Sequence, residues 1–187
     1  KPYSGSISKG VFSGASSTGA QFSLKRIVRK SPSLGAKPPR DAVVLFDGTK
    51  ESMKNWQGGR FDEKTGLLNT DGNDIRTKQK FLNYIMHVEF MLPFKPDARS
   101  QGRGNSGFYQ VDMYEMQILD SFGLMGLNNE CGGIYQKADS KVNMCLPHLQ
   151  WQVYDVDFNS AVMIDAKKVS NAVLTARLNG VTIHEKL

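Results

Sequence analysis

The chain has 187 residues, of which 40% are hydrophobic and 22% charged, a composition typical of one globular domain with a sizeable core. No stretch approaches the roughly 20 apolar residues of a transmembrane helix, so we predict no membrane span. The net charge of +6 comes from residues 1–40, which hold eight Lys or Arg and no acidic residue; residues 41–187 hold 16 basic and 18 acidic residues. This basic segment is rich in Ser, Gly and Pro rather than forming a basic stripe on a folded face, so no nucleic-acid partner is predicted. The sequence predicts an N-terminal segment and linker over 1–40 and a domain over 41–187.

The first elements in chain order are weak. Residues 1–19 are rich in Ser and Gly and are predicted to be loop or weak strand, whereas residues 21–29 have the composition of a strand. Residues 31–39 include a Pro-Pro pair, which favours extended chain, and are predicted to be a linker. Residues 43–46 predict a short buried strand closed by an Asp-Gly turn.

From residue 82 onward the pattern indicates strands. Alternating residues of Leu82–Leu92 are apolar, which predicts a strand with one buried face. Residues 161–168 could form at most a turn or two of helix. Asn179-Gly180 is a good type I′ hairpin turn. The fold class is therefore all-β, a sandwich or jelly roll. The other predicted strands are 106–111, 113–119, 133–136, 150–158, 173–178 and 181–184.

Cys131 and Cys145 are the only cysteines. Neither belongs to a Cys-x-x-Cys pair, so a zinc knuckle is not expected. Two interpretations stay open at this point. The pair could form a disulfide that staples the loop between them, or the two residues could be buried free thiols.

A glycine-bracketed polar turn, Arg103–Gly107, precedes a strand that carries a carboxylate and an amide. Because side chains alternate along a strand, Glu115 and Gln117 point one way, and Tyr114 and Met116 the other. The face with Glu115 and Gln117 is predicted to lie outside the core. Such a surface is suited to binding sugars or to acid–base chemistry.

Eight short strings occur in an order and spacing that resemble the 3-keto-disaccharide hydrolase domain family. The resemblance covers about residues 41–187. The strings are Val44–Gly48, Trp56, His87–Phe90, Gly104–Gly107, Tyr114–Gly123, Gly132–Tyr135, Trp151–Asp155 and Leu178–Val181.

This resemblance implies a concanavalin A-like jelly-roll sandwich of two curved antiparallel sheets, with the ligand on the concave face. It also implies an exported bacterial protein, periplasmic or extracellular. Domains of the family continue past the Asn-Gly-Val hairpin, so we expect this domain to be truncated at its C-terminus or to have its last strands outside the chain.

The resemblance implies a glycosidase, but with a particular chemistry. Retaining glucanases of jelly-roll type place two carboxylates at i and i+4 on one strand, roughly 5–5.5 Å apart. The residue four after Glu115 is Leu119, and Asp120 is expected on the opposite face, which disfavours this route. A 3-keto sugar needs only one base, because the ketone acidifies the C2 hydrogen and elimination followed by hydration cleaves the glycoside. Glu115 is the candidate base.

The remaining candidates are assigned around this strand. Gln117, Asn105 or His87 could stabilise the developing oxyanion or hold sugar hydroxyls. No cofactor is certain, but a divalent metal could do the same through His87, Glu89 or His148. Each candidate also has a structural alternative: a turn cap, a cross-strand ion pair or ordinary packing. The main rival function is a non-catalytic, lectin-like carbohydrate-binding module. The candidates for binding a 3-keto-glycoside or oligosaccharide are Asn105, Ser106, Glu89, Tyr135, His148 and Trp151.

Overall fold

The computed structural model describes residues 3–187 and is built from strands and two short 3₁₀ helices. Every strand pair in it is antiparallel, which confirms the all-β prediction. None of the helices within this range is long and apolar enough to cross a membrane. Contacts divide the chain into a unit that ends at Lys30 and a second unit, Ser31–Leu187.

The first unit is a three-stranded meander in the order β1-β2-β3. Its strands are β1 (Tyr3–Ser8), β2 (Val11–Ser16) and β3 (Gln21–Lys25). The stretch expected to be loop or weak strand therefore forms two paired strands. A tight turn of Lys9 and Gly10, both with positive φ, joins the first two.

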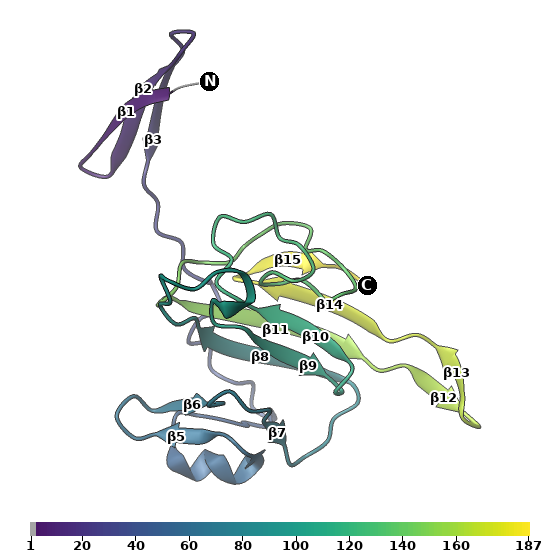
Figure 1. The fold of residues 1–187 in the computed structure, drawn as a ribbon. Helices are drawn as coiled ribbons and strands as arrows, with labels where there is room; N and C mark the ends of the chain where they lie inside the picture. The colour runs from purple at the N-terminus through teal and green to yellow at the C-terminus, as the bar shows by residue number, and fades with distance from the viewer. Residues whose placement is uncertain (1–2) are drawn as a thin grey trace. The chain divides into compact units, whose positions relative to one another are not determined.

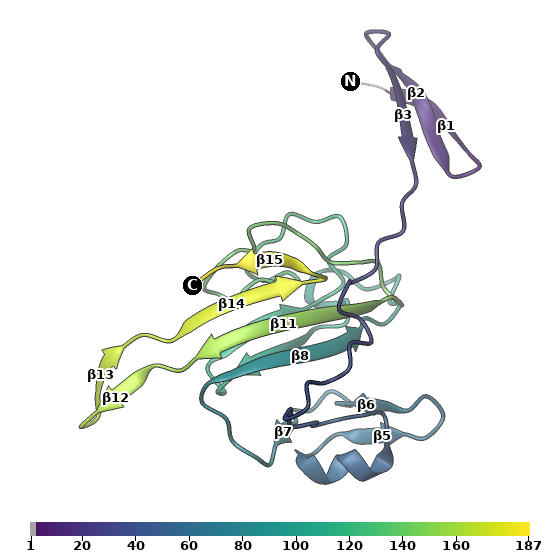
Figure 2. The ribbon, with the colours of Figure 1, turned by 180° about the vertical axis from the view of Figure 1, so that it is seen from behind.

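The second unit is organised around a four-stranded sheet in the order β15-β14-β11-β8 (Figures 1 and 2). The pair formed by β9 and β10 lies against one face of this sheet. This arrangement is consistent with a β-sandwich. The bounds are β8 (Tyr84–Met91), β9 (Ser106–Gln110), β10 (Tyr114–Ile118), β11 (Trp151–Asn159), β14 (Val173–Leu178) and β15 (Val181–His184).

The core fills the space between these two layers. Met116 of β10 is fully buried and packs in one cluster with Tyr154 and Phe158 of β11. The Tyr154 hydroxyl donates a hydrogen bond of 2.7 Å to the Gln117 carbonyl, which satisfies a buried polar group. Other fully or nearly fully buried members are Leu92, Cys131, Ile134, Cys145, Val156, Leu174, Ala176, Leu178 and Ile183.

Two of the sequence predictions are confirmed closely. The alternating strand predicted over 82–92 is β8, whose residues alternate between half-buried and exposed. The predicted hairpin turn joins β14 to β15, with positive φ at both Asn179 and Gly180. The nearly buried Asn179 side chain also accepts a hydrogen bond from the Val153 amide at 3.0 Å.

Smaller elements surround the sandwich. Helix η1 (Lys50–Asn55) precedes the pairs β4 (Trp56–Gln57) with β7 (Arg76–Thr77) and β5 (Arg60–Asp62) with β6 (Leu67–Asn69). Helix η2 (Ser100–Gly102) precedes β9.

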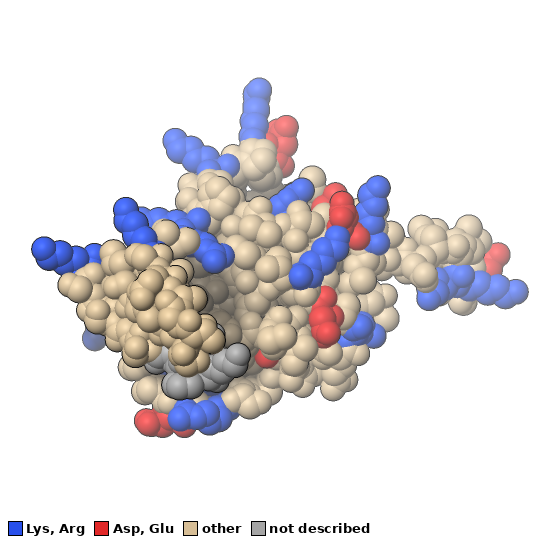
Figure 3. All heavy atoms as spheres, turned by 90° about the horizontal axis from the view of Figure 1, so that it is seen from above, with Lys and Arg blue, Asp and Glu red and all other residues tan. Residues whose placement is uncertain are grey.

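A separate hairpin of β12 (Val162–Ile164) and β13 (Lys167–Ser170) extends away from the four-stranded sheet. It is exposed throughout, and in Figure 3 it carries basic side chains and an acidic one.

Three predicted elements differ from the structure. Residues 43–46 form no strand, and Val43 and Val44 are exposed. Residues 133–136 make only isolated bridges through Ile134, because a turn closes there. Residues 161–168 contribute to the β12–β13 hairpin and not to a helix, since β-branched Val162 and Ile164 precede a two-residue turn.

Residues 31–35, here called the strap, belong to the second unit although the sequence suggested a linker. Pro32 packs against Gly180, where even a methyl group would overlap the proline ring. The Ser33 hydroxyl donates to the Asp155 carboxylate at 2.7 Å, and the Gly35 amide donates to Glu89 at 2.5 Å. The strap therefore lies across the face of the four-stranded sheet that points away from the core.

Candidate functional site

The β9–β10 hairpin presents Glu115 on the face turned away from the core. Tyr114, Met116 and Ile118 point into the cluster beneath, so alternation directs Glu115 outward. Glu115 is half-buried and lies directly opposite Tyr109 in the antiparallel register. The predicted orientation of Glu115 is therefore confirmed.

Gly107 leaves the space that the Glu115 side chain occupies. A methyl group on Gly107 would overlap the Glu115 carboxylate, which shows that this side chain leans over the neighbouring strand. The glycine that ends the Gly104–Gly107 motif is thus a packing requirement of the acid on β10.

Two tyrosines accompany Glu115. The Tyr109 hydroxyl faces the Glu115 carboxylate; hydrogen bonding to that carboxylate, with partial burial, raises the pKa of Tyr109 to about 12. Tyr109 is 50% exposed and lies within electrostatic range of Tyr135. The Tyr135 amide donates to the Glu115 carbonyl at 2.9 Å. The backbone of Tyr135 is therefore next to that of Glu115, and the role of Tyr135 in binding stays a prediction.

Tyr109 itself was not among the candidates. The signal that could have found it is the short loop between the two predicted strands, because residues 111–113 set the register that pairs Tyr109 with Glu115.

Gln117 shares the outward direction of Glu115, but it is 1% exposed, so the expectation that this face lies outside the core is wrong at this position. Its amide donates to the Gln101 side chain at 3.0 Å, and its side-chain oxygen accepts from the Ile118 amide at 2.9 Å. Burial of a polar amide requires such partners. Gln117 therefore supports the hairpin and helix η2 from within.

The polar turn before β9 contributes less than predicted. Asn105 is exposed and precedes the strand. Ser106 begins β9 and shares the face of Phe108, which packs against the core. Alternation therefore directs Ser106 away from the Glu115 side.

Three candidates lie on the opposite side of the sandwich from Glu115. His87 and Glu89 of β8, and Trp151 of β11, are on the face of the four-stranded sheet that the strap crosses. Along β8 and β11 these three residues alternate with core residues. Their side chains therefore point away from the core and away from Glu115. The expectation that His87 acts together with Glu115 is therefore corrected.

His87 instead bridges two carboxylates. Its Nδ1 lies 2.7 Å from Asp155 and its Nε2 lies 3.2 Å from Glu89, the same two residues that accept hydrogen bonds from the strap. Burial lowers the pKa of His87, but the bonds to Asp155 and Glu89 outweigh it, so the pKa is raised above its usual value.

This raised pKa predicts a pH-dependent stability. A histidine whose folded pKa exceeds its unfolded value stabilises the protein fully below the unfolded pKa, about 6.5, and loses that contribution as pH rises through the folded pKa. We expect His87→Gln to flatten the fall in unfolding free energy as the pH rises above about 6.5, the unfolded pKa of histidine. Urea denaturation of both proteins measures this. Burial lowers the pKa of His184, but this residue is present in wild type and variant alike, so its contribution cancels when the two stability curves are subtracted. Parallel curves would contradict the prediction.

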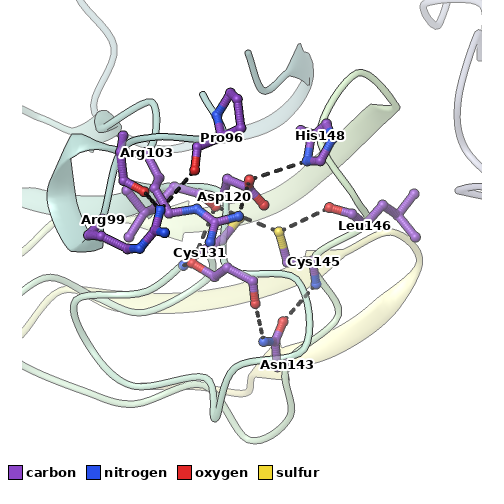
Figure 4. A network of polar contacts seen from close by, with 12 residues as sticks. Pro96, Arg99, Arg103, Asp120, Cys131, Asn143, Cys145, Leu146 and His148 are labelled. Atoms are coloured by element: carbon purple, nitrogen blue, oxygen red, sulfur yellow. Dashed lines mark hydrogen bonds and ion pairs between the residues drawn. The ribbon is translucent and has the colours of Figure 1, made fainter. Parts of the chain in front are cut away.

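A second polar network lies where β10 ends (Figure 4). The Asp120 carboxylate is 3% exposed and accepts a hydrogen bond of 2.6 Å from Arg103. His148 lies 3.4 Å from the same oxygen, and its ring stacks on Phe94 at 4.6 Å. Asp120 Oδ1 and Arg103 Nε are buried and have no hydrogen-bond partner within residues 3–187.

The structure does not bring His87, Glu89 and His148 together as one metal site. His148 belongs to the Asp120 network, whereas the other two lie under the strap. In the described part of the chain, no group of three or more His, Cys, Asp or Glu side chains is arranged to hold a metal ion.

Comparison with known proteins decides the family. Residues 41–186 match the model of the 3-keto-alpha-glucoside-1,2-lyase-like domain. The chain belongs to this family. That range contains the Glu115 site and the Asp120 network and begins after the strap.

A solved structure supports the same family. The crystal structure of a candidate glycosyl hydrolase from Parabacteroides distasonis has a TM-score of 0.74 and 29% identity, and the match covers 88% of this chain and 74% of that one. No curated protein matches the chain. This member of the 3-keto-alpha-glucoside-1,2-lyase-like family is thus similar in structure to a protein described as a candidate glycosyl hydrolase.

Proposed function

We propose that this chain cleaves glycosidic bonds of 3-keto-glycosides, with Glu115 as the base. The observation that carries the proposal is a single outward carboxylate, half-buried and hydrogen-bonded to a tyrosine hydroxyl. The residue four positions further on is the buried Leu119, and Asp120 is bound to Arg103. One base without a partner on its strand fits elimination better than two-carboxylate hydrolysis.

The proposed reaction has two halves. Glu115 removes the C2 proton, the C2 electron pair forms an enolate with the C3 ketone, and the enolate expels the C1 oxygen of the leaving group. Water then adds to C1 and the proton returns to C2. Tyr109, with a pKa of about 12, is protonated at neutral pH and supplies a hydrogen-bond donor for negative charge beside Glu115.

The family and its solved relative support a carbohydrate substrate. We further propose that β9 and β10 belong to the concave sheet of a concanavalin A-like jelly roll, because Glu115 is on the face opposite the core. Export to the periplasm or outside of the cell is proposed from the sequence resemblance, and cell fractionation tests it.

A lectin-like module is the second candidate. Half-exposed Tyr109 beside Tyr135 offers aromatic surface to a sugar ring without any requirement for chemistry.

The deciding experiment compares a chromogenic 3-keto-glucoside with the parent glucoside, each with and without chelator. Release of the chromophore from the keto substrate alone supports the proposal. Loss of that release in the presence of chelator would show that the reaction also needs a metal ion. Equal release from both substrates contradicts the requirement for a ketone. Saturable sugar binding without release from either favours the lectin-like module.

Gly107→Ala tests the positioning of Glu115. The added methyl group displaces a flexible carboxylate end and not backbone, so the melting temperature should change little. Activity should fall by up to about 100-fold, since small misplacement of a catalytic group is costly. Gly102→Ala is the matched control, because its methyl group would make only an ordinary contact of 3.5 Å with Ala98. Unchanged activity of Gly107→Ala would count against Glu115 acting from its observed position.

A further inference from the structure

The two cysteines meet at the base of the loop formed by residues 131–145. Cys131 is fully buried and Cys145 is 5% exposed. The two thiols lie close enough to interact, which lowers the pKa of Cys131 and raises that of Cys145. The Cys145 thiol donates to the Leu119 carbonyl at 3.6 Å, and the Cys131 sulfur lies 3.4 Å from the Tyr154 hydroxyl. The thiols are free in the structure.

The ends of this loop are fixed by other bonds as well (Figure 4). The Cys131 amide donates to the Ser121 hydroxyl at 2.9 Å, and the Asn143 amide group donates to the Ser121 carbonyl at 2.8 Å. The Asn143 side-chain oxygen in turn accepts from the Cys145 amide at 2.9 Å. Ser121 thus binds both ends of the loop, and these hydrogen bonds hold the two cysteines near each other.

We propose that Cys131 and Cys145 form an intramolecular disulfide that closes this loop. Each thiol loses one proton and one electron as the S–S bond forms. One molecule of glutathione disulfide accepts the two protons and two electrons, and its own S–S bond breaks to give two molecules of reduced glutathione. The loop carries Tyr135, whose amide bonds to the Glu115 carbonyl, so the bond would fix Tyr135 beside β10. The proposal is independent of the reaction that Glu115 performs.

Burial of both sulfurs places the oxidation during folding, before an oxidant is excluded. The test unfolds the reduced chain and refolds one half with reduced glutathione only and the other with a mixture of reduced and oxidised glutathione. Thiols are then counted in denaturant, and a non-reducing peptide map locates any bond. We expect no free thiol after oxidative refolding and a peptide linking the two cysteines. The melting temperature should exceed that of the reduced half by roughly 5–10 °C.

The melting transition of the reduced half reports whether the chain folds without the bond, so the comparison needs no variant. Cys145→Ala, refolded in the same mixture, serves as an added control and should show no rise in melting temperature. Two free thiols after oxidative refolding would overturn the proposal. Glutathione bound to each cysteine, or dimers linked between chains, would overturn it equally.

Discussion

Replacing Glu115 with Gln should lower kcat on a 3-keto-glycoside by about 100- to 10,000-fold, the usual contribution of a general base. Gln keeps the shape of the side chain and can still accept a hydrogen bond from Tyr109, but it cannot take up the C2 proton. KM should change little, because the substrate contacts persist. Steady-state kinetics with the chromogenic substrate measures both constants.

Two further variants serve as comparisons for Glu115→Gln. Glu51→Gln makes the same chemical change on exposed helix η1, where Glu51 only pairs with Lys54, and should leave kcat unchanged. Tyr109→Phe keeps the base but removes its hydrogen bond, and should cost roughly tenfold. Wild-type turnover by Glu115→Gln would refute the assignment of the base.

The largest expected loss of stability follows from Arg103→Met. Asp120 is almost completely buried, and Arg103 is its closest charged partner at 2.6 Å. Removing the guanidinium leaves a buried carboxylate with only the more distant His148, which should lower the free energy of unfolding by roughly 3 kcal/mol. Met retains much of the apolar stem, so the change reports on charge more than on packing. Urea denaturation measures the loss.

The double variant Arg103→Met with Asp120→Leu should recover much of this loss, because no charge is then left buried. The matched control is Arg60→Met, which breaks an exposed pair with Asp71 and should cost no more than about 1 kcal/mol. Equal losses at Arg103 and Arg60 would show that burial of Asp120 does not govern the effect.

Local patterns predicted most of the central strands. Period-two alternation identified β8, and the Asn179-Gly180 turn identified β14 and β15, because both signals depend on neighbours in sequence. Short apolar runs were less informative: residues 43–46 remain exposed, since a run of four does not specify a partner strand. The β12–β13 hairpin was missed because its turn residues, Asp165 and Ala166, lack the glycine expected at positive φ.

The candidate site was predictable only within one strand. Alternation placed Glu115 correctly, and it gave the direction of Gln117, but it could not show that helix η2 covers that amide. The polar positions of β8 and β10 also look alike in sequence. Which of them share a face depends on how two sheets stack, and that is decided by contacts between residues distant in the chain, such as Met116 with Tyr154.

The strap bears on where this chain can be cut for laboratory work. The family match begins at residue 41, so a truncation designed from it would discard residues 31–35. The Asp155 and Glu89 carboxylates would each lose a hydrogen-bond donor, and Gly180 would lose the proline that packs on it. A fragment that begins at Ser31 retains all three contacts, and should resist protease and express in folded form better than one that begins at Asp41.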